Sequence, residues 1–453
     1  MTECSNKDLD LIKYNPKKAV IVLAIPLMIA VFVELLNDVI DGIWVGGLGP
    51  QALSAIEFVS PLFLVLIAIG LALNAGTVAG MSKYLGQGNK EKAENVAMHA
   101  ILLVVILSIV IPIFLLVFFD PVLIMLGAKS VLPLAEQYGF FVIVGIYSLI
   151  IPFVLQAVFL AEGKGKHATI PLIVATIINI LLDPIMIYTF DFGVAGASIS
   201  NMIAQTLFAL LPMVYWIFIK KSTYLDINFK KFKLNLGIYK ELLFIAIPVY
   251  LEQFFVSFLT VLIHMVLAVV GISTSVAIFS ASWRFINLGM GPAIAIGTAM
   301  VTVLGYAYGA KNWDNFKMIF NYSIIISFIV SLIFAVVIFI FSKNIAGLFG
   351  TDPAFIKHTS DAIRTMILII PLTSWGMIGV YYLQTVGKGA MLLVLTFLKE
   401  IVLTYSFMIF FASFDIGGYA VGLGVTVGYI IGALLLYLYS RYDVKRILKS
   451  NIS

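Results

Sequence analysis

The chain has 453 residues, of which 62% are hydrophobic and only 11% are charged. Soluble domains use about 25% charged residues, so this composition excludes a soluble globular protein and indicates a chain that crosses a membrane many times. Its single cysteine, Cys4, precedes the first apolar stretch, which excludes disulfide bonds within the chain and cysteine-based metal sites.

The apolar stretches follow a polar segment over residues 1–18 that lacks the short apolar core of a removable signal peptide. Twelve stretches are long enough to cross about 30 Å of hydrocarbon. They begin near residues 19, 53, 95, 134, 168, 195, 241, 275, 317, 360, 390 and 416. We therefore expect an all-α membrane protein with 12 transmembrane helices.

The lysines and arginines predict the orientation of these spans. If the N-terminus is cytoplasmic, 22 of the 28 basic residues fall in cytoplasmic tails and loops, and only Lys129, Lys343 and Lys357 fall in outer loops. This asymmetry is the positive-inside pattern, so we expect both termini to be cytoplasmic. It also explains the net charge of +5 without nucleic acid, because the lysines mark the face that meets anionic lipids.

The two halves of the sequence resemble each other. AIPLMIAVFVE around Pro26 matches AIPVYLEQFFV around Pro248, and FDFGVAGASIS at 190–200 matches FDIGGYAVGLG at 414–424, with an offset of 222 to 224 residues. Six spans per half give two parallel repeats, a plan that secondary transporters use with the substrate path between the halves. The expected parts are an N-terminal cytoplasmic tail (1–18), an N-lobe (19–220), a cytoplasmic linker (221–240), a C-lobe (241–440) and a C-terminal cytoplasmic tail (441–453).

Three acidic residues, Glu34, Asp38 and Asp41, interrupt the first apolar span at positions i, i+4 and i+7. This spacing places them along one stripe of a helix. Each charge inside a membrane costs about 2.5–3.5 kcal/mol on insertion scales and usually faces a cavity or a partner. Because close carboxylates repel each other, we expect at least one to be protonated or bound to a cation. The repeat places Ile263 opposite Asp41, so the acidic stripe belongs to one half only.

The fifth span offers a partner for these acids. Asn179 and Asp183 lie four residues apart on one helical face, at a depth similar to that of Asp41 in the outer half of the membrane. Two carboxylates with amide and hydroxyl oxygens can hold a proton or a sodium ion, and the residue types do not choose between them. A set of buried hydrogen bonds that fixes helix packing is the structural alternative. Further polar candidates on neighbouring spans are Gln156, Ser200 and Asn201.

The second half carries fewer intramembrane charges. Glu252 in the seventh span and Arg284 in the eighth are a candidate ion pair, although Glu252 could equally meet a cationic substrate. For Arg284 a structural role is favoured. Lys399 and Glu400 are adjacent in the eleventh span, and successive residues of an α-helix point in different directions, so we expect these two side chains to point apart. Lys399 is then a structural or gating charge in mid-membrane.

Several long motifs, in order along the chain, carry a family resemblance. They are DGIWVGGLGPQALSA, YLGQGNKEKA, NILLDPIMIYTFDFGVAGA, and SASWRF followed by GYAYGAKN. Over about residues 15–440 the chain resembles the multidrug and toxic compound extrusion (MATE) family, and it is most similar to the prokaryotic DinF-like branch. The resemblance implies two six-helix lobes that form a V, open alternately to each side of the membrane, and export organic cations or drug-like molecules with H⁺ or Na⁺ as the coupling ion.

The resemblance also implies roles for single residues. Asp41 matches the family's essential first-span aspartate, and Asn179 and Asp183 match its fifth-span pair. These three residues would be the metal ligands if the coupling ion is Na⁺. Gln156 and Asn201 stand where relatives often carry asparagine and threonine, and both replacements keep an oxygen donor.

The first span departs from the family pattern. Asn37 stands where close relatives carry tyrosine, and Glu34 and Asp38 replace amides, which makes this lobe unusually acidic. The extra acids either bind the positive charge of the drug or add proton capacity. The expected coupling-ion or substrate-binding set is Asp41, Asp183, Asn179, Gln156, Asn201, Glu34, Asn37 and Asp38, with Glu252 and Arg284 as possible members in the C-lobe.

Three other functions compete with an antiporter. A lipid-linked glycan flippase of the same superfamily would handle anionic diphosphate headgroups and needs a basic cavity, whereas the acids here predict a negative one. An intramembrane aspartyl protease would place tyrosine before one aspartate and Gly-x-Gly before the other, but Ile40 precedes Asp41 and Leu182 precedes Asp183. A passive channel does not explain a repeat with one acidic half.

The expected setting of the protein follows from these observations. We expect a multi-pass protein of a prokaryotic plasma membrane that contacts membrane lipids, binds no nucleic acid and acts as a monomer, because the repeat already supplies a pseudo-dimer. No arrangement of a nucleophile with its activating residues, no phosphate loop and no His/Cys metal cluster is recognisable in the sequence. We therefore expect no enzymatic activity and no cofactor other than the coupling H⁺ or Na⁺.

Overall fold

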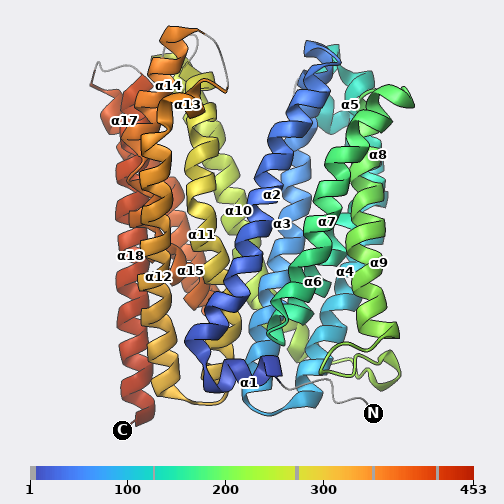
Figure 1. Ribbon diagram of the computed structural model, residues 1–453, viewed down its shortest axis with the longest axis vertical. Helices are drawn as coiled ribbons and strands as arrows, with labels where there is room; N and C mark the ends of the chain where they lie inside the picture. Colours follow the sequence, from blue (N-terminus) through green and yellow to red (C-terminus); the bar gives the residue numbers. More distant parts are fainter. Residues whose placement is uncertain (1–6, 126–127, 271–274, 349–351, 415–417, 453) are drawn as a thin grey trace. The chain divides into compact units, whose positions relative to one another are not determined.

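The computed structural model describes residues 7–125, 128–270, 275–348, 352–414 and 418–452, and the regular secondary structure in these ranges is entirely helical (Figure 1). Helices dominate because a backbone inside hydrocarbon must satisfy its own hydrogen bonds. Among the described residues, 11 helices are long and apolar enough to cross a membrane, and a bent pair of helices adds a twelfth span. The all-α, twelve-span prediction is confirmed.

The chain divides into two units, Met1–Asn15 with Ile25–Tyr250 (unit 1) and Pro16–Ala24 with Leu251–Ser453 (unit 2). The first twelve elements in chain order are α1 (Lys7–Tyr14), α2 (Pro16–Gly46), α3 (Pro50–Gly86), α4 (Lys90–Met125), η1 (Ala128–Ser130), α5 (Leu132–Val144), α6 (Ile146–Ala161), α7 (Gly165–Pro184), η2 (Ile185–Thr189), α8 (Val194–Ala204), η3 (Gln205–Leu210) and α9 (Leu211–Val214). The others are η4 (Tyr215–Ile219), η5 (Phe229–Lys231), α10 (Leu236–Val270), α11 (Ser275–Gly309), α12 (Trp313–Ile340), α13 (Ser342–Ala346), α14 (Pro353–Met366), α15 (Ile369–Thr385), α16 (Gly389–Phe397), η6 (Leu398–Thr404), α17 (Tyr405–Ala412) and α18 (Gly418–Ile452).

The unit boundaries differ from the expected lobes at the first turns of α2 and α10. The start of α10 belongs to unit 1 because Glu241 accepts hydrogen bonds from Lys83 and from the Tyr84 hydroxyl of α3, both at 2.6 Å. The start of α2 belongs to unit 2, where the ammonium group of Lys17 lies 5.6 Å from the ring centroid of Tyr322. The first turns of α2 and α10 are equivalent in the two repeats, and each belongs to the unit that does not contain the rest of its helix.

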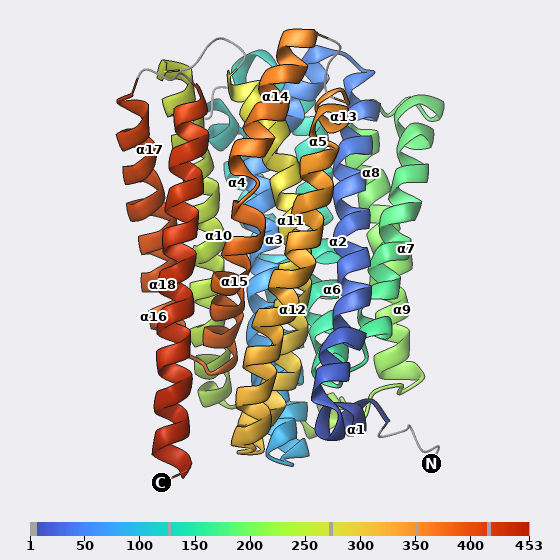
Figure 2. The same ribbon diagram turned by 60° about the vertical axis from the view of Figure 1, so that its left-hand side comes forward.

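A proline explains the bent span. The axes of α14 and α15 differ by 44° at a break of a few residues (Figure 2). Pro371 lies in the first turn of α15, and its ring would clash with the carbonyl of Ile367, four residues earlier, in a continuous helix. The stretch expected to begin near residue 360 is consequently two helices instead of one.

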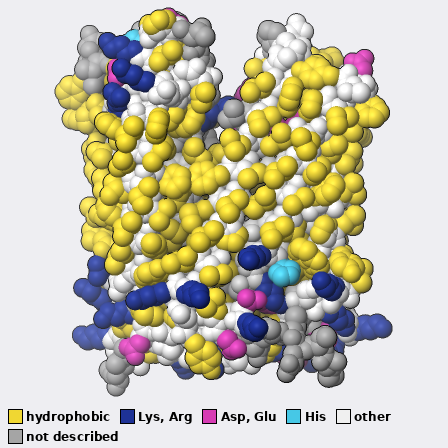
Figure 3. All heavy atoms as spheres, in the orientation of Figure 1, with side chains coloured by type: hydrophobic (Ala, Val, Ile, Leu, Met, Phe, Trp, Pro, Cys, Tyr) yellow, Lys and Arg dark blue, Asp and Glu magenta, His cyan; other side chains and the backbone are white. Residues whose placement is uncertain are grey.

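Apolar side chains cover the middle of the molecular face in Figure 3, and lysines and arginines gather toward the helix ends. This is the pattern of helices that meet lipid along their middle and headgroups at their ends. Within unit 2, one apolar core joins Leu259 and Ile263 of α10 to Met408 of α17 and Val425 of α18. Residues of α10, α17 and α18 therefore share one apolar core.

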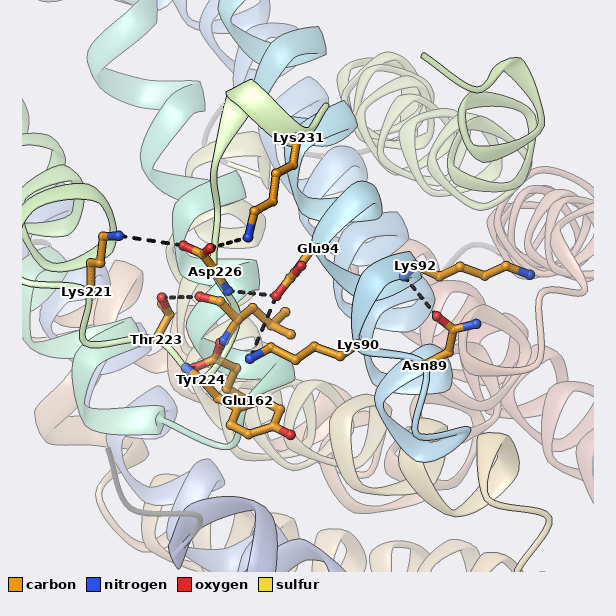
Figure 4. A network of polar contacts seen from close by, with 11 residues as sticks. Asn89, Lys90, Lys92, Glu94, Glu162, Lys221, Thr223, Tyr224, Asp226 and Lys231 are labelled. Carbon is orange, nitrogen blue, oxygen red and sulfur yellow. Dashed lines mark hydrogen bonds and ion pairs between the residues drawn. The ribbon is translucent and has the colours of Figure 1, made fainter. Parts of the chain in front are cut away.

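Two acids of unit 1, the buried Glu162 and the partly exposed Glu94, hold the linker that follows η4. The Glu162 carboxylate accepts hydrogen bonds from the backbone amides of Tyr224 at 2.9 Å and Leu225 at 3.0 Å, and from the Lys164 ammonium group at 2.8 Å. Glu94 accepts from the backbone amide of Asp226 at 2.8 Å (Figure 4). Burial raises the pKa of the Glu162 carboxyl, and Lys164 with the two amides offsets part of that rise. The linker is therefore folded and held to unit 1 by hydrogen bonds.

The turn between α6 and α7 depends on a glycine. Gly163 has a φ of 80°, and a side chain there would also meet Ile12 of α1. The equivalent turn between α15 and α16 contains Gly387 with a φ of 72°. Each glycine is followed by a lysine, and both lysines pair with buried carboxylates: Lys164 with Glu162, and Lys388 with Asp443. The two repeats thus share, at this turn, a glycine with positive φ and a lysine paired with a buried carboxylate.

Candidate functional site

Asp183 and Asn179 lie on the last two turns of α7, and each side chain is only 1% exposed. The next residue, Pro184, is followed by the π-helical turn η2. Widened turns of this kind occur often at functional sites, because they shift the side chains that follow out of the α-helical register. The sequence prediction that these two residues share a helical face is confirmed by a hydrogen bond of 3.0 Å from the Asn179 amide to Asp183 Oδ1.

Ser200 of α8 completes the surroundings of Asp183. Its hydroxyl donates to Asp183 Oδ1, and it accepts from the Asn179 amide at 3.1 Å. Ser200 is fully buried. Asn201 is the neighbouring residue on α8, and its amide lies 3.5 Å from the Asn179 oxygen. Three polar residues from two helices therefore orient one carboxyl group.

Asp41 of α2 reaches the same carboxyl group from the other side. The Asn37 amide donates to Asp41 Oδ2 at 2.8 Å, and the Asp41 and Asp183 carboxyl groups lie within hydrogen-bonding reach of each other. Asp41 Oδ1 and Asp183 Oδ2 are both buried, and neither has a partner in the hydrogen-bond pattern of the described residues. Two carboxylates in contact repel each other unless a proton or a cation lies between them. The buried pair is thus able to bind one positive charge.

Gln156 has a hydrogen-bond partner outside the carboxylate pair. Its side-chain oxygen accepts from the Asn74 amide of α3 at 3.2 Å, and the same amide donates to the Phe153 carbonyl at 2.7 Å. No hydrogen bond between described residues joins Gln156 to Asp41 or Asp183. Asn74 was not among the sequence candidates, although an asparagine within an apolar span is itself a signal of a buried contact.

Glu34 and Asp38 do not belong to the buried Asp41–Asp183 pair. Both side chains are exposed, whereas Asp41 is half-buried and Asn37 is 8% exposed. The helical stripe is therefore divided: Asn37 and Asp41 face α7, and the two additional acids face outward from α2. They remain candidates for contact with a ligand, not members of the carboxylate pair.

Two aromatic residues outside the sequence candidates adjoin the pair. The Tyr188 hydroxyl of η2 donates to the backbone carbonyl of Trp44 on α2, and their rings meet edge to face at 6.4 Å. Trp44 follows Asp41 by one turn, and Tyr188 follows Asp183 by five residues. Trp44 and Tyr138 also pack on a small apolar cluster with Val45. The aromatic residues thus tie α2 to η2 next to the acids.

The expected ion pair in the second half is not formed. Arg284 is exposed on α11, and no salt bridge links it to Glu252 within the described residues. The charged groups that act on Glu252 are Lys399 and Glu400. The prediction was wrong because sequence spacing does not determine the rotation of α10 relative to α11.

Lys399 and Glu400 also differ from expectation, since they form a salt bridge of 2.6 Å. They lie in η6, a π-helical stretch whose turn is wider than that of an α-helix, so successive side chains diverge less. The Thr404 hydroxyl donates to the Lys399 carbonyl at 2.7 Å across this turn. An analysis based on α-helical periodicity cannot detect this pairing.

Metal ligands of the usual kind are not gathered anywhere in the described part of the chain. No three His, Cys, Asp or Glu side chains there are arranged to hold a metal ion. A sodium ion at Asp41 and Asp183 would therefore depend on amide and hydroxyl oxygens in addition to the two carboxylates.

Comparisons with known proteins agree with this architecture. The MatE family model matches residues 26–185 and 248–410, one segment in each repeat. The multidrug export protein MepA of Staphylococcus aureus (strain bovine RF122 / ET3-1) is 24% identical over 428 residues, which cover 94% of each chain.

Solved structures are more similar in sequence. One is described as the outward-facing conformation of a multidrug resistance MATE family transporter of the MOP superfamily; it is 31% identical, with a TM-score of 0.95 over 98% of this chain and 99% of that one. Another, a MOP superfamily transporter from Pyrococcus furiosus, is 32% identical, with a TM-score of 0.93 over 97% and 98% of the chains. Its binding pocket is described as having reverse polarity that suggests a different function.

Proposed function

We propose, from the premise that this chain belongs to the MatE family, that it is a cation-coupled antiporter that exports organic cations or drug-like molecules. Members of this family are transporters and not enzymes, and relatives that match over nearly the whole chain include a multidrug export protein and a multidrug resistance transporter. The coupling ion binds at Asp41 and Asp183, and the exported molecule leaves as the ion enters.

One observation carries this proposal. Asp41 Oδ1 and Asp183 Oδ2 are buried oxygens of two carboxyl groups in contact, and the described residues give neither of them a hydrogen-bond partner. Burying a charge costs several kcal/mol unless it is compensated. A proton shared between the two oxygens, or a cation bound to both, provides that compensation and supplies a site that fills and empties during transport.

The local hydrogen bonds favour a proton over sodium. A hard cation takes several oxygen ligands, but the Asn179 side-chain oxygen already faces the Asn201 amide, and Asp183 Oδ1 already accepts from Asn179 and Ser200. The two remaining carboxylate oxygens suffice for one shared proton. Sodium coupling, with Asp41, Asp183 and Asn179 as ligands, is the alternative that the transport experiment distinguishes.

The proposed setting is a prokaryotic plasma membrane with both termini in the cytoplasm. The distribution of lysines and arginines supports this orientation. We propose that the protein works as a monomer surrounded by lipid, with small organic molecules as its partners. No observation favours a lipid-linked glycan flippase.

The test is efflux of ethidium, a monocationic dye, from proteoliposomes with an imposed pH gradient or an imposed sodium gradient. We expect the pH gradient to drive efflux in the wild type and Asp41→Asn to abolish it. Glu57→Gln is the matched control, because it removes a carboxylate of the same unit that lies outside the pair and is expected to leave efflux unchanged. Efflux that ignores both gradients, or that survives Asp41→Asn, would contradict the proposal.

A further inference from the structure

A second group of intramembrane charges lies in unit 2. Its members are Glu252 of α10, Lys399 and Glu400 of η6, and Tyr429 of α18, called here the unit-2 charge cluster. The Lys399–Glu400 salt bridge measures 2.6 Å, and the Lys399 ammonium group lies 4.4 Å from the ring centroid of Tyr429. Glu400 is 2% exposed, and its Oε2 lacks a hydrogen-bond partner among the described residues.

Glu252 adjoins this pair. One turn after Glu252, the Phe255 ring meets the Phe397 ring at 5.4 Å, which holds α10 against the start of η6. Lys399 acts on Glu252 as the opposite charge and Glu400 as the like charge. Glu252 is half-buried and makes no salt bridge with any described residue, so its carboxylate can meet a ligand.

A structural role explains only part of this cluster. A buried Lys–Glu pair can fix packing, but apolar residues of similar volume do so equally well or better. The third charge has no such role: when Glu252 is ionised, one lysine and two glutamates give the cluster a net charge of −1, which is costly in mid-membrane. A ligand with one positive charge would compensate it.

The cluster is not the repeat copy of the carboxylate pair. The offset of 222 residues places Glu252 opposite Ala30 and Asp41 opposite Ile263. Glu252 therefore precedes the equivalent of Asp41 by 11 residues, or about 16 Å along the helix. On the other helix, where the offset is 224 residues, Glu400 is equivalent to Thr176, two turns before Asp183. The two units thus carry different sites at different depths.

We propose that the unit-2 charge cluster binds the exported molecule, and that Lys399 sets its preference for ligands with a single positive charge. This rests on the proposed export of organic cations. Glu252 meets the positive charge of the ligand, Glu400 is neutralised by Lys399, and the ring of Tyr429 shields the ammonium group. Without Lys399 the cluster would carry a net charge of −2 and favour dications.

The test compares two dyes that share one ring system: ethidium, with one positive charge, and propidium, with two. Equilibrium binding is measured by fluorescence on purified protein without any ion gradient. We expect Lys399→Gln to raise the affinity for propidium relative to ethidium by about tenfold. We expect Glu400→Gln to weaken binding of both dyes, and to weaken binding of propidium about tenfold more than binding of ethidium. The double variant K399Q/E400Q restores the net charge of −1 and is expected to restore the wild-type ratio.

Two control variants show whether the effect depends on the charge of Lys399 within the cluster. Arg284→Gln removes a positive charge from the same unit but outside the cluster, so the ratio should not change. Lys399→Arg keeps the charge and should keep the ratio. If a single variant of Lys399 or Glu400 fails to fold, the affinity ratio of K399Q/E400Q is compared with that of Glu252→Gln. Of these two proteins, only Glu252→Gln has a net charge in the cluster that differs from the wild type.

The outcomes separate this inference from the proposed function. An affinity ratio that is the same in the wild type, Lys399→Gln and Glu400→Gln overturns the role of Lys399 and leaves ion-coupled export intact. A wild type that binds neither dye contradicts organic cations as substrates and overturns both proposals. All variants are measured at one pH, so linkage to the Asp41–Asp183 pair affects them alike and does not change how they compare with one another.

Discussion

Asp183 depends on its neighbours for its orientation. The Ser200 hydroxyl and the Asn179 amide both donate to its Oδ1, which leaves Oδ2 to face Asp41. Hydrogen bonds to charged groups contribute about 1.5–3 kcal/mol. The polar residues around the pair therefore affect how tightly it holds its cation even though they carry no charge.

Ser200→Ala tests this contribution. Loss of the hydroxyl is expected to change the coupling-ion concentration that gives half-maximal transport by about tenfold, because the free energy of one charge-assisted hydrogen bond is removed. The measurement is dye efflux as a function of pH and of sodium. Ser198→Ala is the matched control, since that buried hydroxyl bonds only the Ala195 carbonyl of its own helix. Equal effects of the two substitutions would contradict the assigned role.

The pair and its polar neighbours Asn179, Ser200 and Asn201 could be predicted from the sequence, whereas the other contacts could not. Carboxylates inside apolar spans are costly enough to be conspicuous, which identified Asp41 and Asp183. The partners of Gln156 and Glu252 depend on how each helix is rotated about its axis, and spacing along one helix contains no such information. Tyr188 was missed because the π-helical turn η2 alters the helical register after Pro184.

At the scale of elements, η6 is packed against glycines of α18. A Cβ atom at Gly428 would overlap the backbone of Thr404, and one at Gly432 would overlap the Lys399 side chain. This close approach holds the widened turn in place. The packing is thus specified jointly by the π-helix and by the glycine spacing of its neighbour.

Gly428→Ala is expected to lower the free energy of unfolding by about 1–3 kcal/mol, because an added methyl group overpacks a close helix contact. Thermal unfolding in detergent measures this loss. Gly422→Ala on the same helix serves as the control, since its Cβ would meet only the Met366 side chain at an ordinary distance of 3.6 Å. A Gly428→Ala protein as stable as the control would mean that η6 relaxes at little cost.

The contact between Glu162 and the linker offers a second test at this scale. Glu162→Gln leaves Lys164 buried without its counter-charge and is expected to cost about 3–5 kcal/mol. The double variant E162Q/K164M removes both charges and should recover much of that stability. Thermal unfolding of the three proteins gives the comparison, and a double variant no more stable than Glu162→Gln would show that the backbone contacts of Glu162 matter more than its ion pair.

At the scale of the whole molecule, duplication conserves packing and varies charge. Gly163 with Lys164 and Gly387 with Lys388 repeat one turn in both units, and the first turns of α2 and α10 change units in the same way. The intramembrane charges do not repeat: unit 1 has the Asp41–Asp183 pair, and unit 2 has Lys399 with two glutamates. We interpret this asymmetry as two separate sites, with the coupling ion bound in unit 1 and the exported molecule bound in unit 2.

The most direct test of the central claim counts protons at equilibrium. Ethidium is added to the purified protein in weakly buffered detergent solution near neutral pH, and proton release is recorded with a pH indicator. We expect about one proton per bound dye from the wild type and none from Asp41→Asn, because ion and substrate exclude each other through linkage. Binding without proton release by the wild type, or unchanged release by Asp41→Asn, would contradict a proton shared by Asp41 and Asp183.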